Sequence, residues 1–393
     1  MTSSCASTTR TATGAPLAGV RVLDLTRLLP GPMGTLHLAD LGADVIKIED
    51  TGAGDYASPP VRALVNRNKR AIRIDLKHAD GAAVLLRLCR DADVLVEGFR
   101  PGVMERLGVG YQAVAAVNPR IVYCSISGFG QSGPLRDMPG HDLNYAALAG
   151  VADQMGNAAG PALSNLPMAD LLGGTMTAVM GILAALFDAA RTGRGRHVDV
   201  AIADGVLAHG VLPLAGLHRE GRVPPVGVGT LTGSLACYGF YRTGDGRQVA
   251  VGALEPKFWQ ALCVRLERPD LIALHRTGDA ATEERLRGEL AAIFAARPLA
   301  HWTRLFRDGQ ACVTPVLHLD ETLAHPHFRE RGMRVASAEG AAAQLGCPVK
   351  MTGFDPGPPR PAPRAGEHTG EILRQAGFGE SEIAALQAAG AIG

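Results

Sequence analysis

The chain has no Cys-x-x-Cys pair, although 7 of its 393 residues are cysteines. They are scattered over positions 5, 89, 124, 237, 263, 312 and 347, which predicts neither a disulfide framework nor a zinc site and favours a reducing compartment. An excess of charge of either sign is also missing, since 39 Lys and Arg residues stand against 38 Asp and Glu residues. A net charge of +1 gives no polyanion-coating surface, so nucleic acid is not an expected partner.

Long hydrophobic runs are missing as well. The longest, at residues 178–187, is too short to span a bilayer and is followed by Asp188, so no membrane association is predicted. Residues 1–14 are rich in Ser, Thr and Ala without an apolar core, which excludes a secretory signal. Their single Arg and lack of acidic residues weakly resemble an organelle transit peptide, but a disordered tail over residues 1–15 and a cytoplasmic protein are favoured.

What the chain does contain, from Gly19 to Gly128, is an alternation of short β-rich runs with helical stretches. Strands are predicted at residues 20–25, 44–49, 71–76, 94–99 and 121–127, with helices at 33–41 and 80–89. This pattern predicts an α/β fold with a large Rossmann-like open sheet, mostly parallel. The turn at residues 28–34 carries two prolines and lacks the dinucleotide fingerprint, so NAD and FAD are excluded there.

Composition changes near Pro224, where a Gly-rich stretch leads into a predicted β-hairpin at residues 238–251. After the hairpin, helices are expected at residues 256–266, 282–295 and 300–308. Before it, we expect a long buried helix at 171–190 and a strand that runs into a helix at 198–208. We therefore predict a large α/β domain over residues 16–224 and a smaller α+β domain over 225–320. A C-terminal segment, 321–393, then returns to the large domain with two closing helices.

Three short pieces offer groups for acid–base chemistry at carbon. The imidazole of His141 can take or give a proton near neutral pH, but a capping or surface histidine explains it equally well. Asp170 precedes an apolar helix, where an N-cap is the commoner role; the functional alternative is a proton donor or nucleophile beside N–H groups that stabilise an enolate oxygen. Glu255, before Pro256, is expected to be a cap or an exposed charge unless it faces an imidazole and fixes its tautomer.

Basic side chains gather around the third and fourth predicted strands. They either form a solvated strand edge or grip phosphates near the carboxyl ends of parallel strands. The set is Arg67, Lys69, Arg70, Arg73 and Lys77, followed by Arg100 and Arg106.

From about Leu17 onward the chain resembles the family III CoA transferases of the CaiB/BaiF type, a family that also contains the α-methylacyl-CoA racemases. The likeness is carried by residues 17–24, 38–47, 98–102 and 127–134, and more broadly by Cys-Val-Thr-Pro-Val at 312–316. The racemase branch is nearest, through Gly-His-Asp-Leu-Asn-Tyr at 140–145 and Gly-Ala-Leu-Glu-Pro at 252–256, where transferases usually show Gly-Asn-Asp.

The resemblance implies that His141 and Asp170 transfer protons on opposite faces of the α-carbon of an acyl-CoA thioester, with Glu255 as the partner of His141. It also implies an interlocked homodimer in which Glu255 reaches His141 of the other chain. No metal and no cofactor are expected, because CoA is part of the substrate. The CoA contacts carried over are Ile74, Asp75, Leu76, Lys77, Gly98, Phe99, Arg100, Arg106, Gly140, Asp142, Leu143, Asn144 and Tyr145.

One position departs from the racemase pattern, because Asp50 stands where racemases usually carry Arg and residues 47–55 are closer to the transferases. The leading hypothesis is a 2-methylacyl-CoA racemase acting through an enolate. The alternatives are a CoA transferase with Asp170 as nucleophile, through an anhydride and a thioester, and a silent protein that only binds CoA esters. The acyl group is left open, since Met176, Met180 and residues 212–217 fit a pocket wall or, more commonly, a core.

Overall fold

The computed structural model describes residues 14–52, 57–157, 160–336 and 343–393, so the predicted tail lies almost wholly outside the described residues. Two compact units make up the chain. Residues up to 149, 165–209 and 326–393 form the large unit, and residues 150–164 and 210–325 form the small unit. Residues 150–164 and 210–224 therefore join the small unit, where the sequence assigned them to the large domain. In the first of these stretches the strands β6 (Gly156–Asn157) and β7 (Gly160–Pro161) pair with each other and not with the large sheet.

The large unit is built on a parallel sheet of 6 strands in the order β3-β2-β1-β4-β5-β8, which confirms the predicted open α/β sheet. The order reverses between β1 and β4, and in such sheets ligands bind at the carboxyl ends beside this reversal. The strands are β1 (Arg21–Asp24), β2 (Asp44–Glu49), β3 (Arg70–Arg73), β4 (Val94–Glu97), β5 (Val122–Ser127) and β8 (His197–Ala201).

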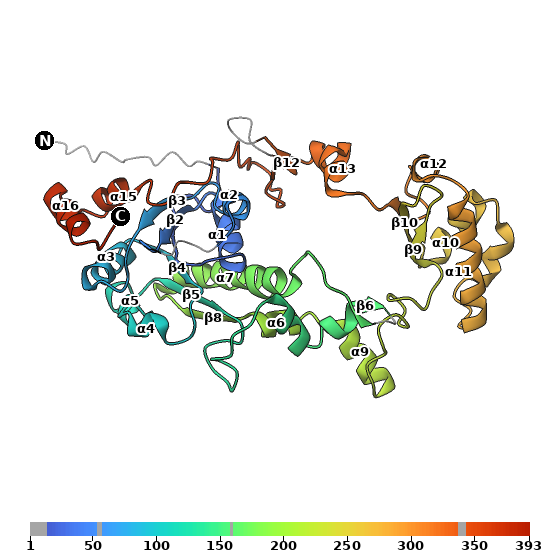
Figure 1. Ribbon diagram of the computed structural model, residues 1–393, viewed down its shortest axis with the longest axis horizontal. Helices are drawn as coiled ribbons and strands as arrows, with labels where there is room; N and C mark the ends of the chain where they lie inside the picture. Colours follow the sequence, from blue (N-terminus) through green and yellow to red (C-terminus); the bar gives the residue numbers. More distant parts are fainter. Residues whose placement is uncertain (1–13, 53–56, 158–159, 337–342) are drawn as a thin grey trace, which may run out of the picture. The chain divides into compact units, whose positions relative to one another are not determined.

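Helices cover both faces of this sheet (Figure 1). On one face α1 packs against α7, and on the other α3 packs against α5 while α15 contacts β3. The helices of the large unit are α1 (Pro30–Asp40), α2 (Pro59–Val65), α3 (Ala79–Cys89), α4 (Val103–Arg106), α5 (Tyr111–Val117), α6 (Asp142–Leu148), α7 (Thr177–Thr192), α8 (Ile202–Leu207), α14 (Pro326–Glu330), α15 (Thr369–Gln375) and α16 (Glu380–Ala388).

The predicted long helix is present, but its first part is a π-helix, η2 (Ala169–Met176), which continues into α7. Close packing against α8 explains Gly173 in this helix and Gly205 in α8. A Cβ at Gly173 would lie 2.3 Å from the carbonyl oxygen of Ile202, and one at Gly205 would lie 2.4 Å from the carbonyl of Gly173. The backbones of η2 and α8 therefore touch, which requires glycine on both sides.

Taken together, η2 and α7 form a helix of 24 residues, Ala169–Thr192, whose most apolar window has a mean hydropathy of 1.7 and is 39% buried. By length and composition alone it is able to cross a membrane. A single such helix is weak evidence for a span, because a core helix of a soluble protein passes the same test. Its Met176 and Met180 side chains are 50% and 66% exposed within this chain, so assigning them to the core was wrong.

The small unit contains the predicted hairpin, formed by β9 (Tyr238–Arg242) and β10 (Gln248–Gly252), with β11 (Val313–Pro315) completing an antiparallel sheet. Its core surrounds Trp259, Phe294 and Trp302. Its helices are α9 (Val211–Glu220), α10 (Pro256–Arg265), α11 (Ala280–Ala295), α12 (Leu299–Leu305) and α13 (Leu319–Ala324), with the 3-10 turns η1 (Ala152–Gln154) and η3 (Pro269–Leu274). The 6 cysteines within the described residues are free thiols.

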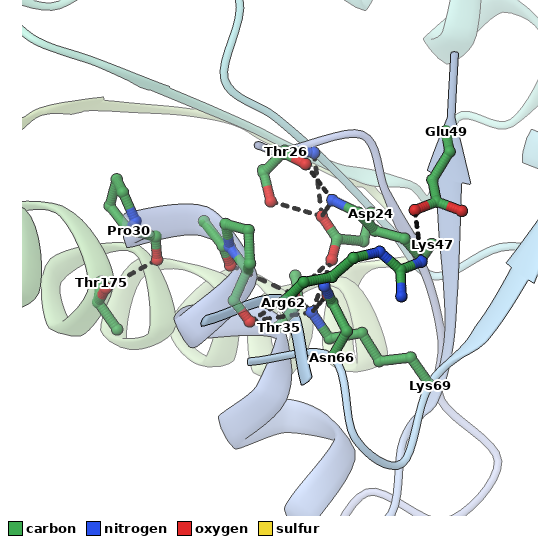
Figure 2. Close-up of polar contacts among 12 residues, drawn as sticks. Asp24, Thr26, Pro30, Thr35, Lys47, Glu49, Arg62, Asn66, Lys69 and Thr175 are labelled. Atoms are coloured by element: carbon green, nitrogen blue, oxygen red, sulfur yellow. Dashed lines mark hydrogen bonds and ion pairs between the residues drawn. The ribbon is translucent and has the colours of Figure 1, made fainter. Parts of the chain in front are cut away.

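Three charged side chains meet in the interior at the carboxyl end of β1 (Figure 2). The side chains of Asp24 and Lys69 are 0% exposed, and that of Lys47 is 1% exposed. One carboxylate oxygen of Asp24 accepts from the N–H and the hydroxyl of Thr26 at 3.0 and 2.5 Å, and the other accepts from Thr35 at 2.6 Å and Lys69 at 3.0 Å. Burial alone would raise the pKa of Asp24, but Lys47, Lys69 and the hydroxyl groups outweigh it and hold that pKa well below its ordinary value.

The same network fixes the chain that follows β1. Three carbonyl groups there accept hydrogen bonds from buried side chains, and Gly31 is needed for the fit, since its Cβ would lie 2.2 Å from the Cβ of Thr26. Both ends of the segment are thereby attached to the charged cluster, and its middle is attached to η2. The pairs are Lys47 to Thr26, Thr175 to Pro30 at 2.7 Å, and Lys69 to Pro32 at 2.9 Å.

Basic residues before and at the start of β3 are likewise buried and held in ion pairs, although Asp44, the partner of Arg70, is 34% exposed. Arg67 contacts Asp40 at 2.5 Å and Arg70 contacts Asp44 at 2.6 Å, while Lys69 belongs to the Asp24 network. Both interpretations, a solvated edge and a phosphate grip, are therefore wrong for these three residues.

Replacing Asp24 by Asn should destabilise the protein by about 3–5 kcal/mol, because the ammonium groups of Lys47 and Lys69 would stay buried without a counter-charge. Urea unfolding at a fixed protein concentration measures this change. As a matched control, Asp188→Asn removes a carboxylate whose partner Arg196 is 62% exposed, and should cost less than about 1 kcal/mol. Equal losses for the two variants would show that the buried network contributes no more than a surface pair.

Candidate active site

Loops at the carboxyl edge of the large sheet enclose a cavity of about 560 Å³. The wall combines an imidazole, a carboxyl group, a phenol and several glycine or proline backbones, so polar groups converge on a space in which a small acyl group fits. The lining residues are Thr26, Arg27, Leu28, Pro30, Gly31, Gly98, Arg100, Pro101, Ile126, Ser127, Gly128, Arg136, Met138, Pro139, Gly140, His141, Asn144, Tyr145, Asp170 and Ile202.

His141 is at the N-cap position of α6, is exposed and lines this cavity. The backbone N–H of His141 donates to the side-chain oxygen of Asn144 at 3.1 Å, and this hydrogen bond fixes the loop. The ring of Tyr145 packs between two glycines, since a Cβ at Gly128 or Gly140 would lie 2.4 or 2.7 Å from it. The Tyr145 hydroxyl also donates to the carbonyl of Gly140. The motif at residues 140–145 is thus a turn held by its own hydrogen bonds and packing, and it carries His141 at the cavity.

Asp170 is the second residue of η2 and does not cap the helix, because the N-cap position belongs to Met168. The cap interpretation is therefore wrong, and the Asp170 side chain lines the cavity. Its own N–H donates to a carboxylate oxygen of Asp142 at 2.9 Å. The backbone N–H of Leu171 donates to the carbonyl of Pro167 at 3.0 Å. Neither N–H is therefore offered to an enolate oxygen as the helix start stands.

The electrostatics of this corner favour a proton on Asp170. Burial is the largest cause, the charge of the neighbouring Asp142 acts in the same direction, and His141 opposes both. The pKa of Asp170 is raised from 3.8 to about 6, so the carboxyl group exchanges its proton close to neutral pH. The pKa of Tyr145 is raised too, first by burial and then by the charge of Asp170. A carboxyl group with this raised pKa and an imidazole therefore line one cavity.

A second cavity of about 370 Å³ lies along the same edge, at the carboxyl ends of β1, β2, β3 and β4. Its floor is mostly apolar and its rim carries charges of both signs. The lining residues are Leu25, Arg27, Ile48, Glu49, Asp50, Gly52, Ile74, Leu76, Lys77, Phe99, Val103 and Leu107.

The predicted CoA contacts distribute over these two cavities, with exceptions. Ile74, Leu76, Lys77 and Phe99 line the second cavity, whereas Gly98, Arg100, Gly140, Asn144 and Tyr145 line the first. Asp75, Arg106, Asp142 and Leu143 line neither. Asp75 accepts from the N–H of Lys77 at 2.9 Å, and Asp142 acts on the site through Asp170.

Glu255 lies in the small unit, at the N-cap position of α10, with an exposed side chain that makes no capping hydrogen bond. Its pairing with His141 remains a prediction. Within the described part of the chain, no group of three or more His, Cys, Asp or Glu side chains is arranged to hold a metal ion.

Sequence reasoning missed the segment after β1, of which Thr26, Arg27 and Leu28 line the first cavity. Its two prolines served only to exclude a dinucleotide site. The position itself was informative, because the first strand of a doubly wound sheet ends beside the topological reversal. The effect of Asp142 on Asp170 was also missed, since it depends on a contact across 28 positions of sequence.

Comparison with known proteins agrees with this geometry. The sequence profile of CoA-transferase family III matches residues 17–369. The chain is 37% identical over 371 residues to the alpha-methylacyl-CoA racemase of Homo sapiens, covering 93% of this chain and 95% of the relative. It is 34% identical to the acetyl-CoA:oxalate CoA-transferase of Acetobacter aceti, covering 92% and 95%. A crystal structure of a CAIB/BAIF family protein from Brucella suis superimposes with a TM-score of 0.80 at 27% identity, covering 92% of this chain and 99% of that one.

These matches extend over nearly the whole chain and include both units, so they confirm the resemblance drawn from the motifs. The chain belongs to CoA-transferase family III, whose members are enzymes that act on acyl-CoA thioesters.

Proposed function

We propose that the chain is a 2-methylacyl-CoA racemase that inverts the α-carbon through an enolate. The observation that carries this proposal is the pairing of His141 and Asp170 on the wall of one cavity, because racemisation needs one base and one acid on opposite faces of the carbon. A relative named as a racemase, 37% identical over 371 residues, supports it.

In this mechanism the thioester group makes the α-proton acidic enough for a side-chain base. The imidazole of His141 takes the proton from one face, and protonated Asp170 returns a proton to the other face; the reverse reaction uses ionised Asp170 and protonated His141. A pKa near 6 suits Asp170 to both tasks, since the best proton-transfer groups titrate close to the working pH. No metal or redox cofactor takes part in this scheme.

A CoA transferase is the second candidate, and relatives named as transferases support it, such as the one at 34% identity from Acetobacter aceti. In that reaction the ionised carboxylate of Asp170 attacks the thioester carbonyl and releases the CoA thiolate, leaving a mixed anhydride. The thiolate then attacks the enzyme carbonyl of that anhydride, which gives an enzyme thioester and frees the acyl carboxylate. The incoming acid finally repeats these exchanges in the reverse order. His141 has no required part in these steps.

We also propose a homodimer in which Glu255 completes the site of the other chain. Within the large unit, Met176, Met180 and Phe187 form an exposed apolar row on η2 and α7, with exposures of 50%, 66% and 65%. Apolar side chains in such a row favour cover by another protein surface. A carboxylate supplied by the partner would hold the tautomer of His141 and raise its basicity.

In heavy water, the wild-type protein should exchange the α-proton of a chiral 2-methylacyl-CoA for deuterium and convert each enantiomer into the other. His141→Ala should lower the exchange of the enantiomer whose α-proton faces His141 by about 100-fold or more, because the base on that face is lost. Interconversion of the enantiomers should fall in both directions, while Asp170 still exchanges the α-proton on its own face. The control His327→Ala removes an exposed imidazole outside both cavities and should leave the rate unchanged. Mass spectrometry and chiral chromatography follow the two events. A wild-type protein that transfers CoA between acids without α-exchange would establish the second candidate instead.

Asp142→Asn should move the pH dependence of exchange toward lower pH. The variant removes a charge that raises the pKa of Asp170, while its side-chain oxygen still accepts from the Asp170 N–H. In the direction that needs ionised Asp170, the wild-type rate should rise with pH through about 6, and in the variant this rise should begin at a lower pH. Profiles of kcat/KM measure the shift, with Asp188→Asn as control. Identical profiles for Asp142→Asn and wild type would contradict the assigned coupling.

Co-expression of His141→Ala and Glu255→Gln chains tests the shared site. Each variant alone should be nearly inactive. If the two residues come from different chains, a mixed dimer keeps one intact site, and random assembly restores about one quarter of the wild-type activity. If they come from the same chain, both sites of the mixed dimer are damaged and no activity returns.

A further inference from the structure

Among the described residues, Arg27 is the only one that lines both cavities at the carboxyl edge of the large sheet. It follows Thr26 directly at the end of β1, where the strand order reverses. The cavity on one side holds His141 and Asp170, and the cavity on the other side has Ile74, Leu76 and other apolar side chains on its floor. A ligand that occupies both cavities must therefore pass the guanidinium group.

The two cavities differ in the chemistry that they accept. Acid–base groups line the first and suit a thioester and its α-carbon, whereas the apolar floor of the second suits a flat ring system. An acyl-CoA ester carries these parts at its two ends, with a diphosphate between the nucleoside and the pantetheine arm. In an ester with its thioester at His141 and its nucleoside in the second cavity, the parts between these two ends, the diphosphate among them, lie along the edge that Arg27 borders.

We propose that Arg27 binds the diphosphate of the CoA ester and so sets how far the pantetheine arm extends toward His141 and Asp170. This inference rests on the proposed function only in so far as the ligand is a CoA ester. The guanidinium group is suited to the task, because its planar fork donates two parallel hydrogen bonds to phosphate oxygens.

Two neighbours hold the Arg27 side chain at the junction. Its guanidinium carbon lies 5.2 Å from the centre of the Phe99 ring, a cation–π contact, and one terminal nitrogen lies 3.8 Å from a carboxylate oxygen of Asp50. The side chain is 29% exposed and that of Asp50 is 24% exposed, so the cation is partly desolvated but reachable. At 3.8 Å the ion pair with Asp50 is loose, and a diphosphate competes with that carboxylate for the same cation.

The backbone around Arg27 is fixed as firmly as its side chain. On one side, the Thr26 carbonyl accepts from buried Lys47. On the other side, Leu28 has a φ of +65°, in the left-handed region that a residue with a Cβ rarely adopts. Such strained positions persist only where surrounding structure determines them, and they cluster at ligand sites. The position of Arg27 is therefore set before a ligand arrives, which lowers the entropy lost on binding.

Calorimetric titration of the full chain with CoA and with dephospho-CoA tests this inference, because neither ligand requires turnover. Arg27→Met should weaken both ligands by roughly 10- to 100-fold, since a charged hydrogen-bonding partner of the diphosphate is lost. Asp50→Asn should do the opposite and tighten both ligands by about 2- to 10-fold, because the competing carboxylate is gone. Arg27→Lys keeps the charge without the fork and should fall between wild type and Arg27→Met.

The matched control is Arg120→Met, which removes an exposed arginine at the opposite, amino-terminal edge of the sheet and should leave both affinities unchanged. Circular dichroism verifies that each variant is folded. A purely structural Arg27–Asp50 pair would make Arg27→Met and Asp50→Asn weaken binding alike, and that result overturns the inference. A loss confined to CoA would assign Arg27 to the 3′-phosphate and also overturn it.

These outcomes are separable from those of the exchange assay. One result is that the wild-type protein shows no α-exchange while Arg27→Met and Asp50→Asn shift the CoA affinity in opposite directions. This result would end the racemase proposal and keep the diphosphate contact. If the wild-type protein exchanges the α-proton and Arg27→Met binds CoA with unchanged affinity, the racemase proposal stands and the diphosphate contact is overturned.

Discussion

The buried carboxylate of Asp24 is the constraint on which the active-site wall depends. Two ammonium groups, Lys47 and Lys69, lie beside it with side chains 1% and 0% exposed. A cluster of this kind is expensive to desolvate and keeps its shape only while every member is bonded, so it contributes geometry more than stability. Lys47 and Lys69 also donate hydrogen bonds to the carbonyls of Thr26 and Pro32. The ion cluster therefore fixes the backbone position of the loop after β1.

That loop in turn couples the two halves of the site. Its middle is attached to η2 through the hydroxyl of Thr175, five positions after Asp170 in the same π-helix. Pro30 also packs closely on this helix, since a Cβ at Gly174 would lie 3.0 Å from its ring. Asp170, the proposed proton-transfer group, and Arg27 at the junction of the cavities are therefore both positioned by one hydrogen-bonded segment. Chemistry that tolerates little displacement between a bound thioester and its catalytic groups requires such a frame.

The order of strands and helices in the large sheet followed from the sequence, because buried parallel strands are short apolar runs and their helices have a clear period. Motifs also identified His141 and Asp170 before any geometry was known. The state of Asp170 could not be predicted, since the sequence around it is compatible with an N-cap, and only the fold shows that Met168 takes that position. Arg67, Lys69 and Arg70 were misassigned for a related reason. Their partners Asp40, Asp24 and Asp44 are distant in the sequence, so the sequence does not show whether a basic side chain contacts a ligand or a carboxylate of the protein.

The titration of Asp170 bears on why racemases and transferases share one family. A carboxyl group with its ordinary pKa of 3.8 is always ionised near neutral pH and serves well only as a nucleophile. Burial and the charge of Asp142 bring that pKa to about 6, where a substantial fraction is protonated and the same group is also an acid. Under the proposed racemase mechanism, the difference between the two reactions reduces to whether an imidazole faces the carbon on its other side. In this chain His141 lines the same cavity as Asp170, at the N-cap of α6 in a turn that encloses Tyr145 between two glycines.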